Sequence, residues 1–360
     1  MSQALSLARL AQGQVSPNPA VGAVIVHDGM VAGQGYTQPP GQAHAEIVAL
    51  RQAGEKARGA VLYVTLEPCC HTGRTPPCTK AIITAGVAEV HLASIDDNPV
   101  VAGKGVKELE SAGIKTIIGE CEEEARTINE AYIKYITTGI PFITVKYAAS
   151  LDGKIATGSG DSRWITGEAA RKQVHTMRYL ADAVMVGINT VLADNPQLTV
   201  RCSGLGGMTR KQPLRVVVDG KGRTPLTAQL LKEPGKALIA LGRKATAAEK
   251  DSFGRAGAEV LEFPGDDGLV DLVDLMKTLG KRAVTSVLVE GGGILNSSLF
   301  EKHMVDKVVA FIAPVIIGGE KARTPVAGAG INKVADAIRL RHVSIERFDD
   351  DLMVSGYVEK

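Results

Sequence analysis

The sequence has few aromatic residues, no long apolar run and no excess of either charge. Aromatic side chains make up 4% of the 360 residues, and 41 basic residues are balanced by 39 acidic ones. No stretch reaches the roughly 18 apolar residues of a membrane-spanning helix, which excludes such a segment. The charge balance excludes a strongly basic nucleic-acid coat and an acidic disordered tail. The first 14 residues lack the pattern of a signal peptide, so we expect a cytoplasmic protein.

The remaining composition is typical of a globular protein. Hydrophobic residues account for 45% of the chain and charged residues for 22%, values that argue against disorder. At about 150 residues per domain, the length predicts two domains. The 40 glycines indicate many tight turns, or backbone that lies close to ligands.

The five cysteines are unevenly placed. Cys69, Cys70 and Cys78 lie within ten residues of one another, whereas Cys121 and Cys202 are isolated. An odd and crowded set is a poor disulfide framework, and in a reducing compartment it indicates metal or redox chemistry. Cys121 and Cys202 have no neighbours at ligand spacing, so we expect them to be small packing residues.

Strand and helix signals alternate along the chain. This rhythm predicts a largely parallel sheet with helices on both faces. A longer helix is predicted over 122–138, and Gly139 and Pro141 then break the chain, which predicts domains at 1–140 and 141–360. The predicted strands are 21–26, 61–66, 89–95, 114–118, 142–148, 183–186, 214–218, 237–241, 287–289 and 307–312, and the other predicted helices are 4–11, 44–53, 78–85, 104–112, 168–180 and 269–279.

One histidine and two cysteines have the pattern of a catalytic zinc site. His44 opens a predicted helix, Cys69 follows Pro68 after a predicted strand, and Cys78 opens another predicted helix. Three protein ligands leave the fourth zinc position to water. Glu46, two residues after His44, would hold this water and move its proton to a leaving nitrogen, as in nucleobase deaminases with His-x-Glu and Pro-Cys-x-x-Cys. The sequence therefore predicts a zinc-dependent deaminase.

The spacing departs from the short deaminase motif. Eight residues, 70–77, separate the two cysteines instead of two. This polar, basic and turn-rich insert would suit a polar, phosphorylated substrate. A structural zinc site would instead need a fourth ligand, for which Cys70 and His71 are the candidates, so both interpretations stay open at this point.

The second half lacks a dinucleotide fingerprint of the G-x-G-x-x-G type. The nearest stretch, 291–296, has no last glycine and comes late in the chain, so a standard dinucleotide-binding fold is not supported. The predicted strand 287–289 nevertheless runs into a glycine turn and a helix start. Exposed N–H groups at such a turn can bind a pyrophosphate, although a plain strand-to-helix turn is the alternative.

Several segments, in order along nearly the whole chain, resemble the family of bifunctional riboflavin-biosynthesis deaminase/reductases. One departure is Cys70, where that family typically has serine, and its role stays open. The segments are 17–22, 44–46, 67–78, 96–105, 150–154, 162–166, 190–196 and 289–292.

The resemblance implies two consecutive reactions on a phosphorylated pyrimidine. A cytidine-deaminase-like three-layer α/β/α domain would hydrolyse the amino group from 2,5-diamino-6-ribosylamino-4(3H)-pyrimidinone 5′-phosphate. A dihydrofolate-reductase-like α/β domain would then reduce the ribosyl group with NADPH to give 5-amino-6-(5-phosphoribitylamino)uracil. The implied cofactors are Zn²⁺ and NADPH. The implied partners are copies of the same chain, in a homodimer or homotetramer paired through the reductase domains, and neither nucleic acid nor membrane.

The resemblance also implies site residues. His44, Cys69 and Cys78 would bind zinc, with Glu46 as the proton shuttle, and Asn18, His71 and Arg74 would hold the pyrimidine and its phosphate-bearing tail. In the second domain, Ser162, Arg178, Leu198, Arg201 and Glu290 would line the substrate. The implied cofactor contacts are Ala148, Trp164, Thr190, Asp194 and Gly220, with a loop of Gly292, Gly293, Ile294, Leu295, Asn296, Ser297 and Ser298.

Residue chemistry leaves some roles open in the second domain. Reduction at the sugar C1′ needs a proton donor, and Lys146, Asp152 and Glu290 lie at predicted strand ends, where each could orient or protonate the sugar. Surface salt bridges are the alternative for Lys146 and Asp152. Trp164, the only tryptophan, could also be a partly buried core residue.

Two other functions fit the zinc motif alone. The first is a nucleic-acid deaminase with a C-terminal binding module, although the near-neutral charge and scarce aromatic residues argue against it. The second is a non-catalytic scaffold that zinc stabilises.

Overall fold

The computed structural model describes residues 1–73, 76–201 and 211–359. The chain divides into two compact units, Met1–Ile140 and Pro141–Lys360, which are described separately below. Within the described ranges, the helices are all too short or too polar to cross a membrane.

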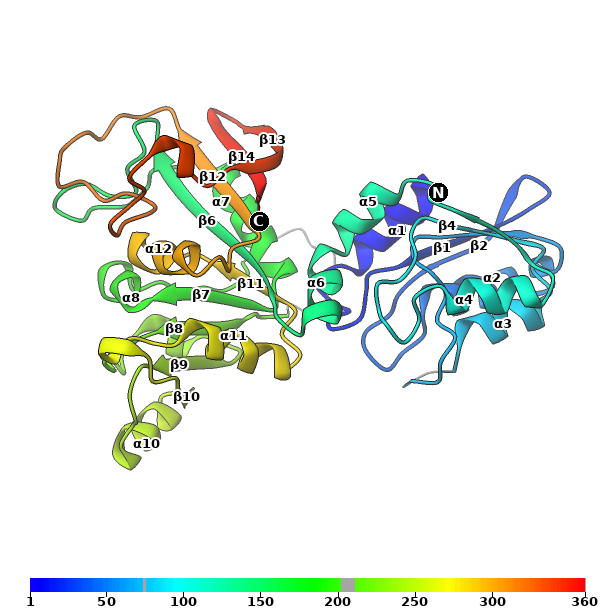
Figure 1. Cartoon of the computed structure of the whole chain (residues 1–360), viewed down its shortest axis with the longest axis horizontal. Coiled ribbons are helices and arrows are strands. Elements are labelled where there is room, and N and C mark those ends of the chain that lie inside the picture. Colours follow the sequence, from blue (N-terminus) through cyan, green and yellow to red (C-terminus); the bar gives the residue numbers. More distant parts are fainter. Residues whose placement is uncertain (74–75, 202–210, 360) are drawn as a thin grey trace. The chain divides into compact units, whose positions relative to one another are not determined.

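The first unit is a five-stranded sheet between two layers of helices (Figure 1). Helices α1 (Ser2–Ala11) and α5 (Glu122–Ile128) cover one face, and α2 (Ala45–Ala53), α3 (Cys78–Ala85) and α4 (Lys104–Ser111) cover the other. The strand order is β2 (Met30–Tyr36), β1 (Gly22–His27), β3 (Val61–Val64), β4 (Glu89–Leu92) and β5 (Lys115–Ile118).

The sheet is mixed, whereas the sequence predicts a largely parallel one. Strands β3, β4 and β5 are parallel, but β1 is antiparallel to both β2 and β3. The difference arises from a β1–β2 hairpin that turns at Asp28 and Gly29, both with positive φ. Strand β2 was not predicted, because its glycines interrupt the apolar alternation of a strand.

These glycines let α2 pack directly on the sheet. A Cβ on Gly33 would lie 2.2 Å from the carbonyl oxygen of Ala49, and one on Gly35 would lie 2.7 Å from that of Ala45. Backbone therefore meets backbone at this contact. Because Gly33 and Gly35 have no side chains, α2 lies close to the sheet. This close approach also sets the position of His44 at the start of the helix.

The long helix predicted over 122–138 is two helices, α5 and α6 (Glu130–Thr138). Asn129 breaks it, because its side chain accepts the N–H of Ala20 at 2.8 Å and donates to the carbonyl of Ala20 at 3.0 Å. Cys121, expected to be a packing residue, is exposed and caps α5 with a φ of 61°. Cys202 lies outside the described residues.

The second unit is built on a nine-stranded sheet. Seven neighbouring strands of this sheet run parallel, and a hairpin of two further strands continues the sheet antiparallel at one edge. The sequence predicted neither this hairpin nor the strand at the opposite edge. The order is β10 (Ala258–Glu262), β9 (Ala237–Leu241), β8 (Leu214–Val218), β7 (Ala183–Gly187), β11 (Ser286–Val289), β6 (Phe142–Ser150), β12 (Lys307–Ala313), β14 (Asp351–Val358) and β13 (Leu340–Phe348).

Helices follow most of the parallel strands in this unit. Helix α8 starts where β7 ends, and three residues separate the end of β11 from the start of α12, so both helix starts lie at the carboxyl edge of the sheet. The predicted helix 269–279 is α11, shifted by a few residues because Asp271 caps its start. The helices are α7 (Glu168–Leu180), α8 (Ile188–Asp194), α9 (Gln229–Lys232), α10 (Ala247–Arg255), α11 (Leu272–Lys281) and α12 (Gly293–Glu301).

Candidate active sites

Three side chains of the first unit form a cluster that suits a metal ion. The ligand atoms of His44, Cys69 and Cys78 lie within 4.8 Å of one another. His44 Nδ1 is 3.6 Å from the Cys69 sulfur and 3.3 Å from the Cys78 sulfur. Zinc bound tetrahedrally at its usual N and S bond lengths sets such atoms about 3.6 Å apart, so the three residues fit zinc.

The start of α3 supports the Cys69 sulfur. The backbone N–H of Cys78 donates to this sulfur at 3.4 Å, and the N–H of Thr79 donates to the Cys69 carbonyl at 3.2 Å. A hydrogen bond from the Cys78 thiol and one from His44 lower the pKa of Cys69 to about 4, although burial opposes this. The same hydrogen bond and burial raise the pKa of Cys78. Cys69 is therefore a ready thiolate ligand.

Glu46 lies beside these three residues, in the first turn of α2. Its side chain is 4% exposed and shares a hydrogen bond with Cys78. Burial, and then the charge of Cys69, raise the pKa of Glu46 to about 7. The carboxyl group is thus placed to hold or release a proton next to the metal-ligand cluster.

A second buried glutamate, which the sequence analysis missed, holds the loop that follows β4. The Glu67 carboxylate accepts the N–H groups of Asp96 at 3.2 Å, Gly103 at 2.9 Å and Val106 at 3.1 Å. Because Glu67 precedes Pro68 and Cys69, these bonds fix the loop after β3 that carries the first sulfur ligand. The Glu67-Pro68-Cys69 sequence was the available signal.

The other predicted residues of this site are placed less closely. Asn18 lies in the turn before β1, where its N–H donates to the Val15 carbonyl, and Arg74 lies outside the described residues. Among the described residues, the metal-ligand cluster comprises only the three side chains above. Neither Cys70 nor His71 belongs to it, so the fourth ligand of a closed structural zinc site is absent from that part of the chain. His71 Nδ1 is buried without a hydrogen-bond partner there.

The second unit contains a buried ion cluster around Glu290, directly after β11. Arg178 of α7 pairs with both carboxylate oxygens, through Nε at 2.5 Å and a terminal nitrogen at 3.0 Å. The Lys146 ammonium on β6 lies 3.6 Å from the same carboxylate, and all three side chains are at most 13% exposed. Burial disfavours the Glu290 anion, but Arg178 and Lys146 outweigh it and lower its pKa to about 2.

The remaining predicted substrate residues are Ser162, Leu198 and Arg201, and two of them make hydrogen bonds. Ser162 donates to Asp194 at 2.8 Å, which joins a predicted substrate residue to a predicted cofactor residue. Leu198 is buried with a φ of 57°, and Arg201 is exposed and bonds to Gln197. Thr199, which no sequence motif indicated, accepts a hydrogen bond from Arg178 at its carbonyl, at 3.1 Å.

The predicted cofactor residues lie along the carboxyl edge of the sheet. Ala148 is near the end of β6, Gly292 and Gly293 follow β11, Thr190 and Asp194 belong to α8 after β7, and Gly220 follows β8. These strands are neighbours in the order β6, β11, β7 and β8. The residues therefore follow one edge across four adjacent strands.

Contacts separate the roles of the glycine run before α12. A Cβ on Gly293 would lie 2.6 Å from the Thr324 carbonyl, so this glycine makes room for the segment 324–327. A Cβ on Gly292 would meet only Thr190 Oγ1, at 3.5 Å. Gly292 and Thr190 therefore lie next to each other, at ordinary van der Waals distance. In the rest of the predicted loop, Leu295, Asn296 and Ser297 are buried, Ser298 is half-buried and Ile294 is 65% exposed.

Two alternatives from the sequence analysis are corrected here. Asp152 accepts Ser150 Oγ at 2.6 Å and the N–H groups of Ile317 and Gly318, which lower its pKa to about 2. It anchors that loop and cannot act as a proton donor at neutral pH. Trp164 is no core residue, because it is 70% exposed and contacts the guanidinium of Arg171.

Comparison with known proteins identifies the family. Residues 141–354 match the RibD C-terminal domain, and residues 1–94 match the cytidine and deoxycytidylate deaminase zinc-binding region. The riboflavin biosynthesis protein RibD of Aquifex aeolicus is 43% identical over 354 residues, which cover 98% of this chain and 96% of that protein. The chain belongs to the RibD family.

Solved structures of RibD proteins also resemble the whole chain. Acinetobacter baumannii RibD (form 1) superposes with a TM-score of 0.88 at 38% identity, over 100% of this chain and 98% of that one. The diaminohydroxyphosphoribosylaminopyrimidine deaminase/5-amino-6-(5-phosphoribosylamino)uracil reductase from Thermotoga maritima gives a TM-score of 0.87 at 35% identity, over 100% and 97%. These matches confirm the predicted fold class.

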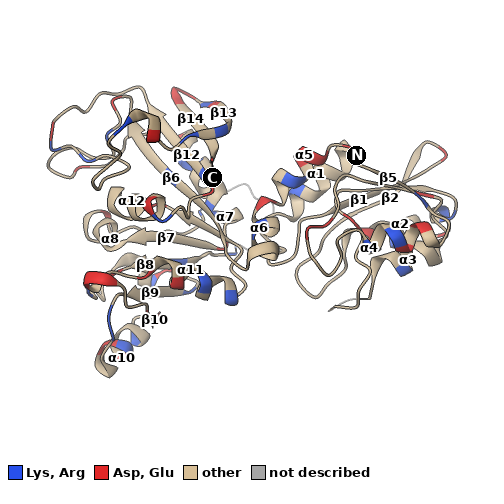
Figure 2. Cartoon of the chain, viewed as in Figure 1, with Lys and Arg blue, Asp and Glu red and all other residues tan. Residues whose placement is uncertain are grey.

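Membership of this RibD family confirms the main functional prediction. The chain is a bifunctional deaminase and reductase of riboflavin biosynthesis, it uses Zn²⁺ and NADPH, and it acts on a phosphorylated pyrimidine. The alternative of a nucleic-acid deaminase required a C-terminal nucleic-acid-binding module, but the C-terminal part of this chain is a reductase domain. In agreement, basic and acidic residues are interspersed along both units (Figure 2).

Proposed function

We propose that the first unit, residues 1–140, deaminates 2,5-diamino-6-ribosylamino-4(3H)-pyrimidinone 5′-phosphate and that the second, residues 141–360, reduces the product. The cluster of His44, Cys69 and Cys78 beside the buried Glu46 carries the first half of this proposal. The Glu290 ion cluster, close to strand ends that carry predicted cofactor residues, supports the second.

In the deaminase unit, His44, Cys69 and Cys78 would hold zinc, which supplies Lewis-acid activation of the attacking water. Glu46 accepts a proton from that water and delivers it to the amino nitrogen, which leaves as ammonia. Burial of Glu46 keeps bulk water away from this transfer. Asn18, His71 and Arg74 stay predictions as substrate contacts.

In the reductase unit, bound NADPH would supply a hydride to C1′ of the opened sugar, and a proton would have to reach the neighbouring oxygen or nitrogen. Glu290 remains ionised at neutral pH, so it orients groups and does not donate protons. The Lys146 ammonium, whose pKa burial lowers, is the proton donor we propose. Ser162, Arg178, Leu198 and Arg201 would position the substrate beside it.

The cofactor would lie along the carboxyl edge from β6 to β8. Ala148, Gly292, Thr190 and Gly220 follow that edge in order. The pyrophosphate would lie beside Gly292, at the start of α12, where backbone N–H groups can bind an anion. Asp194, Trp164 and the remaining residues up to Ser298 would complete the site.

Pairing of copies would occur through the reductase units. Strand β13 is an edge strand, and Val343 and Ile345 on it are 53% and 66% exposed. Exposed apolar edge strands commonly pair with a second chain, which supports a homodimer; a homotetramer is the alternative. Light scattering of Ile345→Lys would show monomers if this strand forms the interface. A cytoplasmic location stays a prediction.

One assay tests the division of labour. The purified chain is given the diaminopyrimidine phosphate without NADPH, and ammonia is measured; NADPH is then added and its absorbance followed. We expect ammonia first and NADPH oxidation second. Ammonia release from RNA but not from the pyrimidine would contradict the substrate, and no turnover with zinc bound would favour a scaffold.

A further inference from the structure

Basic residues gather where the proposed cofactor edge ends. Strands β8 and β9 are parallel neighbours, so the loops after them lie side by side. The first loop carries Lys221 directly after Gly220, and the second carries Arg243 and Lys244. The two loops are bonded together, because the Gly242 N–H donates to the Gly220 carbonyl at 3.1 Å.

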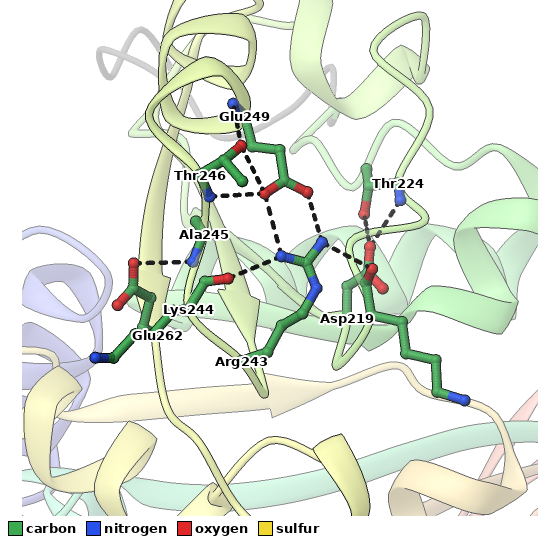
Figure 3. Close-up of polar contacts among 9 residues, drawn as sticks. Asp219, Thr224, Arg243, Lys244, Ala245, Thr246, Glu249 and Glu262 are labelled. Atoms are coloured by element: carbon green, nitrogen blue, oxygen red, sulfur yellow. Dashed lines mark hydrogen bonds and ion pairs between the residues drawn. The ribbon is translucent and has the colours of Figure 1, made fainter.

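The Arg243 guanidinium links the backbones that carry the two lysines, and Figure 3 shows its contacts with Lys244 and Glu249. Arg243 donates to the Lys244 carbonyl at 2.9 Å and to the Lys221 carbonyl at 3.1 Å, and Glu249 pairs with both of its terminal nitrogens. There is no room for a side chain on Gly222, where a Cβ would lie 2.8 Å from Arg243. Arg243 is thus neutralised and fixed, and it sets the positions of Lys221 and Lys244.

Three acidic groups nearby already have partners, although Asp219 Oδ1 is buried without one, and Asp266 and Asp267 precede Gly268, whose carbonyl contacts both loops. Glu249 pairs with Arg243, Glu262 pairs with Lys250 at 2.8 Å, and the buried Asp219 accepts the N–H and hydroxyl of Thr224. Lys221 and Lys244 are both exposed. In the described part of the chain, neither ammonium lies within ion-pair distance of a carboxylate. Two cations are therefore available for an anion.

The direction of the cofactor decides which anion this is. The proposed proton donor Lys146 lies on β6 and the proposed substrate residue Glu290 directly follows β11, so the nicotinamide must face that end of the edge. The adenosine then lies at the opposite end, at the loops after β8 and β9. NADPH and NADH differ only by the 2′-phosphate on this adenosine ribose, and an ammonium binds phosphate as a point charge.

We propose that Lys221 and Lys244 bind the 2′-phosphate of NADPH and thereby select it over NADH, with Arg243 and Glu249 as positioning residues. This inference rests on the proposed course of the cofactor along the sheet edge. The two lysines are far apart in the sequence but close in the fold, because their strands are adjacent and Arg243 bonds to both backbones.

The test is calorimetric titration of the full-length chain with NADPH, NADH and adenosine 2′,5′-bisphosphate. For Lys221→Gln and for Lys244→Gln we expect the Kd of NADPH to rise about 10-fold, and about 100-fold for the double variant. The Kd of NADH should not change. Arg243→Lys keeps the charge but loses both carbonyl bonds. It should also weaken the binding of NADPH without changing that of NADH. Lys250→Gln, which removes a lysine already paired with Glu262, is the matched control and should bind as the wild type does.

Equal binding of NADPH by the double variant and the wild type would overturn the proposal, as would an equal loss for NADPH and NADH. Gly292→Val separates this from failure of the proposed function, because its side chain would occupy the place beside Gly292 that is proposed for the pyrophosphate and should weaken the binding of both cofactors. If Gly292→Val binds both normally, the cofactor course itself is wrong. If it weakens both while the lysine variants change nothing, only the 2′-phosphate site is wrong. Salt should weaken NADPH more than NADH.

Discussion

The two units each bury one glutamate at the proposed reaction centre, and the two carboxyl groups titrate in opposite directions. Burial raises the pKa of Glu46 to about 7, whereas Arg178 and Lys146 overcome burial and lower the pKa of Glu290 to about 2. The same residue type at similar burial thus has different chemistry because of its neighbours. Glu46 can hold a proton near neutral pH, and Glu290 is a permanent anion that organises two cations.

The two sites also differ in how the sequence assembles them. The deaminase ligands lie at the starts of two helices and in the loop after β3, within a short stretch from His44 to Cys78. The reductase ions come from β6, α7 and the end of β11, so Lys146 and Glu290 are distant in sequence. The deaminase ligands are therefore close together in the sequence, whereas the reductase ion cluster forms only when distant segments meet in the folded sheet.

The largest expected effect is on the deaminase alone. Cys78→Ser should lose bound zinc and all ammonia release, because one of three ligands to the metal is removed. Elemental analysis and an ammonia assay check this. Cys121→Ser, at an exposed cysteine outside the cluster, should keep its zinc. Full zinc retention by Cys78→Ser would reject the ligand assignment.

Glu46→Gln should keep zinc but reduce ammonia release by about 10²–10⁴-fold, the usual contribution of a proton-transfer group. A supplied deaminated intermediate should still be reduced at the normal rate, which serves as the internal control. Near-normal deamination would show that Glu46 moves no proton.

Glu290→Gln should destabilise the second unit by about 3–5 kcal/mol, because Arg178 and Lys146 remain buried without their anion. The pKa of Glu290 is below its unfolded value of about 4.3, so its stabilisation is present above that pH and is lost as pH falls towards 2. The gap in unfolding free energy between wild type and variant should therefore narrow from pH 5 to pH 3 in urea titrations. A gap that stays constant over this range would exclude an ionised Glu290. Glu168→Gln, at an exposed pair, is the control.

The smallest effect is structural and lies in the first unit. Asn129→Ala should lower the free energy of unfolding by about 1–3 kcal/mol, because the N–H and carbonyl of Ala20 lose their buried partner. Urea unfolding measures it, with Thr137→Ala, whose hydroxyl bonds only to its own helix, as the control. Zinc content should not change, and no loss of stability would mean that Asn129 does not hold the helix break.

The sequence predicted those features that local patterns encode. Helices α2 and α3 and the cluster of His44, Cys69 and Cys78 follow from motif spacing. Strand β2 was missed because Gly33 and Gly35 serve packing and not strand propensity. The break at Asn129 depends on Ala20, more than 100 residues away, so helical periodicity could not reveal it.

In the second unit, sequence patterns pointed to strand ends but not to the partners across them. Asp152, at a predicted strand end, could have oriented or protonated the sugar. Its carboxylate instead accepts the N–H groups of residues 317 and 318, which are remote in the sequence. Lys221 and Lys244 have no local pattern at all. They come together only because β8 and β9 pair in parallel, which is a property of the sheet order.

The glycines of β2 have a consequence for how the metal-ligand cluster tolerates change. Because helix α2 rests on bare main chain at Gly33 and Gly35, no rotamer can adjust the height of His44 and Glu46 above the sheet. Rearrangement of neighbouring core side chains would not change this distance. A Cβ on Gly33 or Gly35 would instead move the His44 imidazole and the Glu46 carboxyl away from the sheet together. The deaminase centre is thus robust to repacking and fragile at two positions that carry no chemistry.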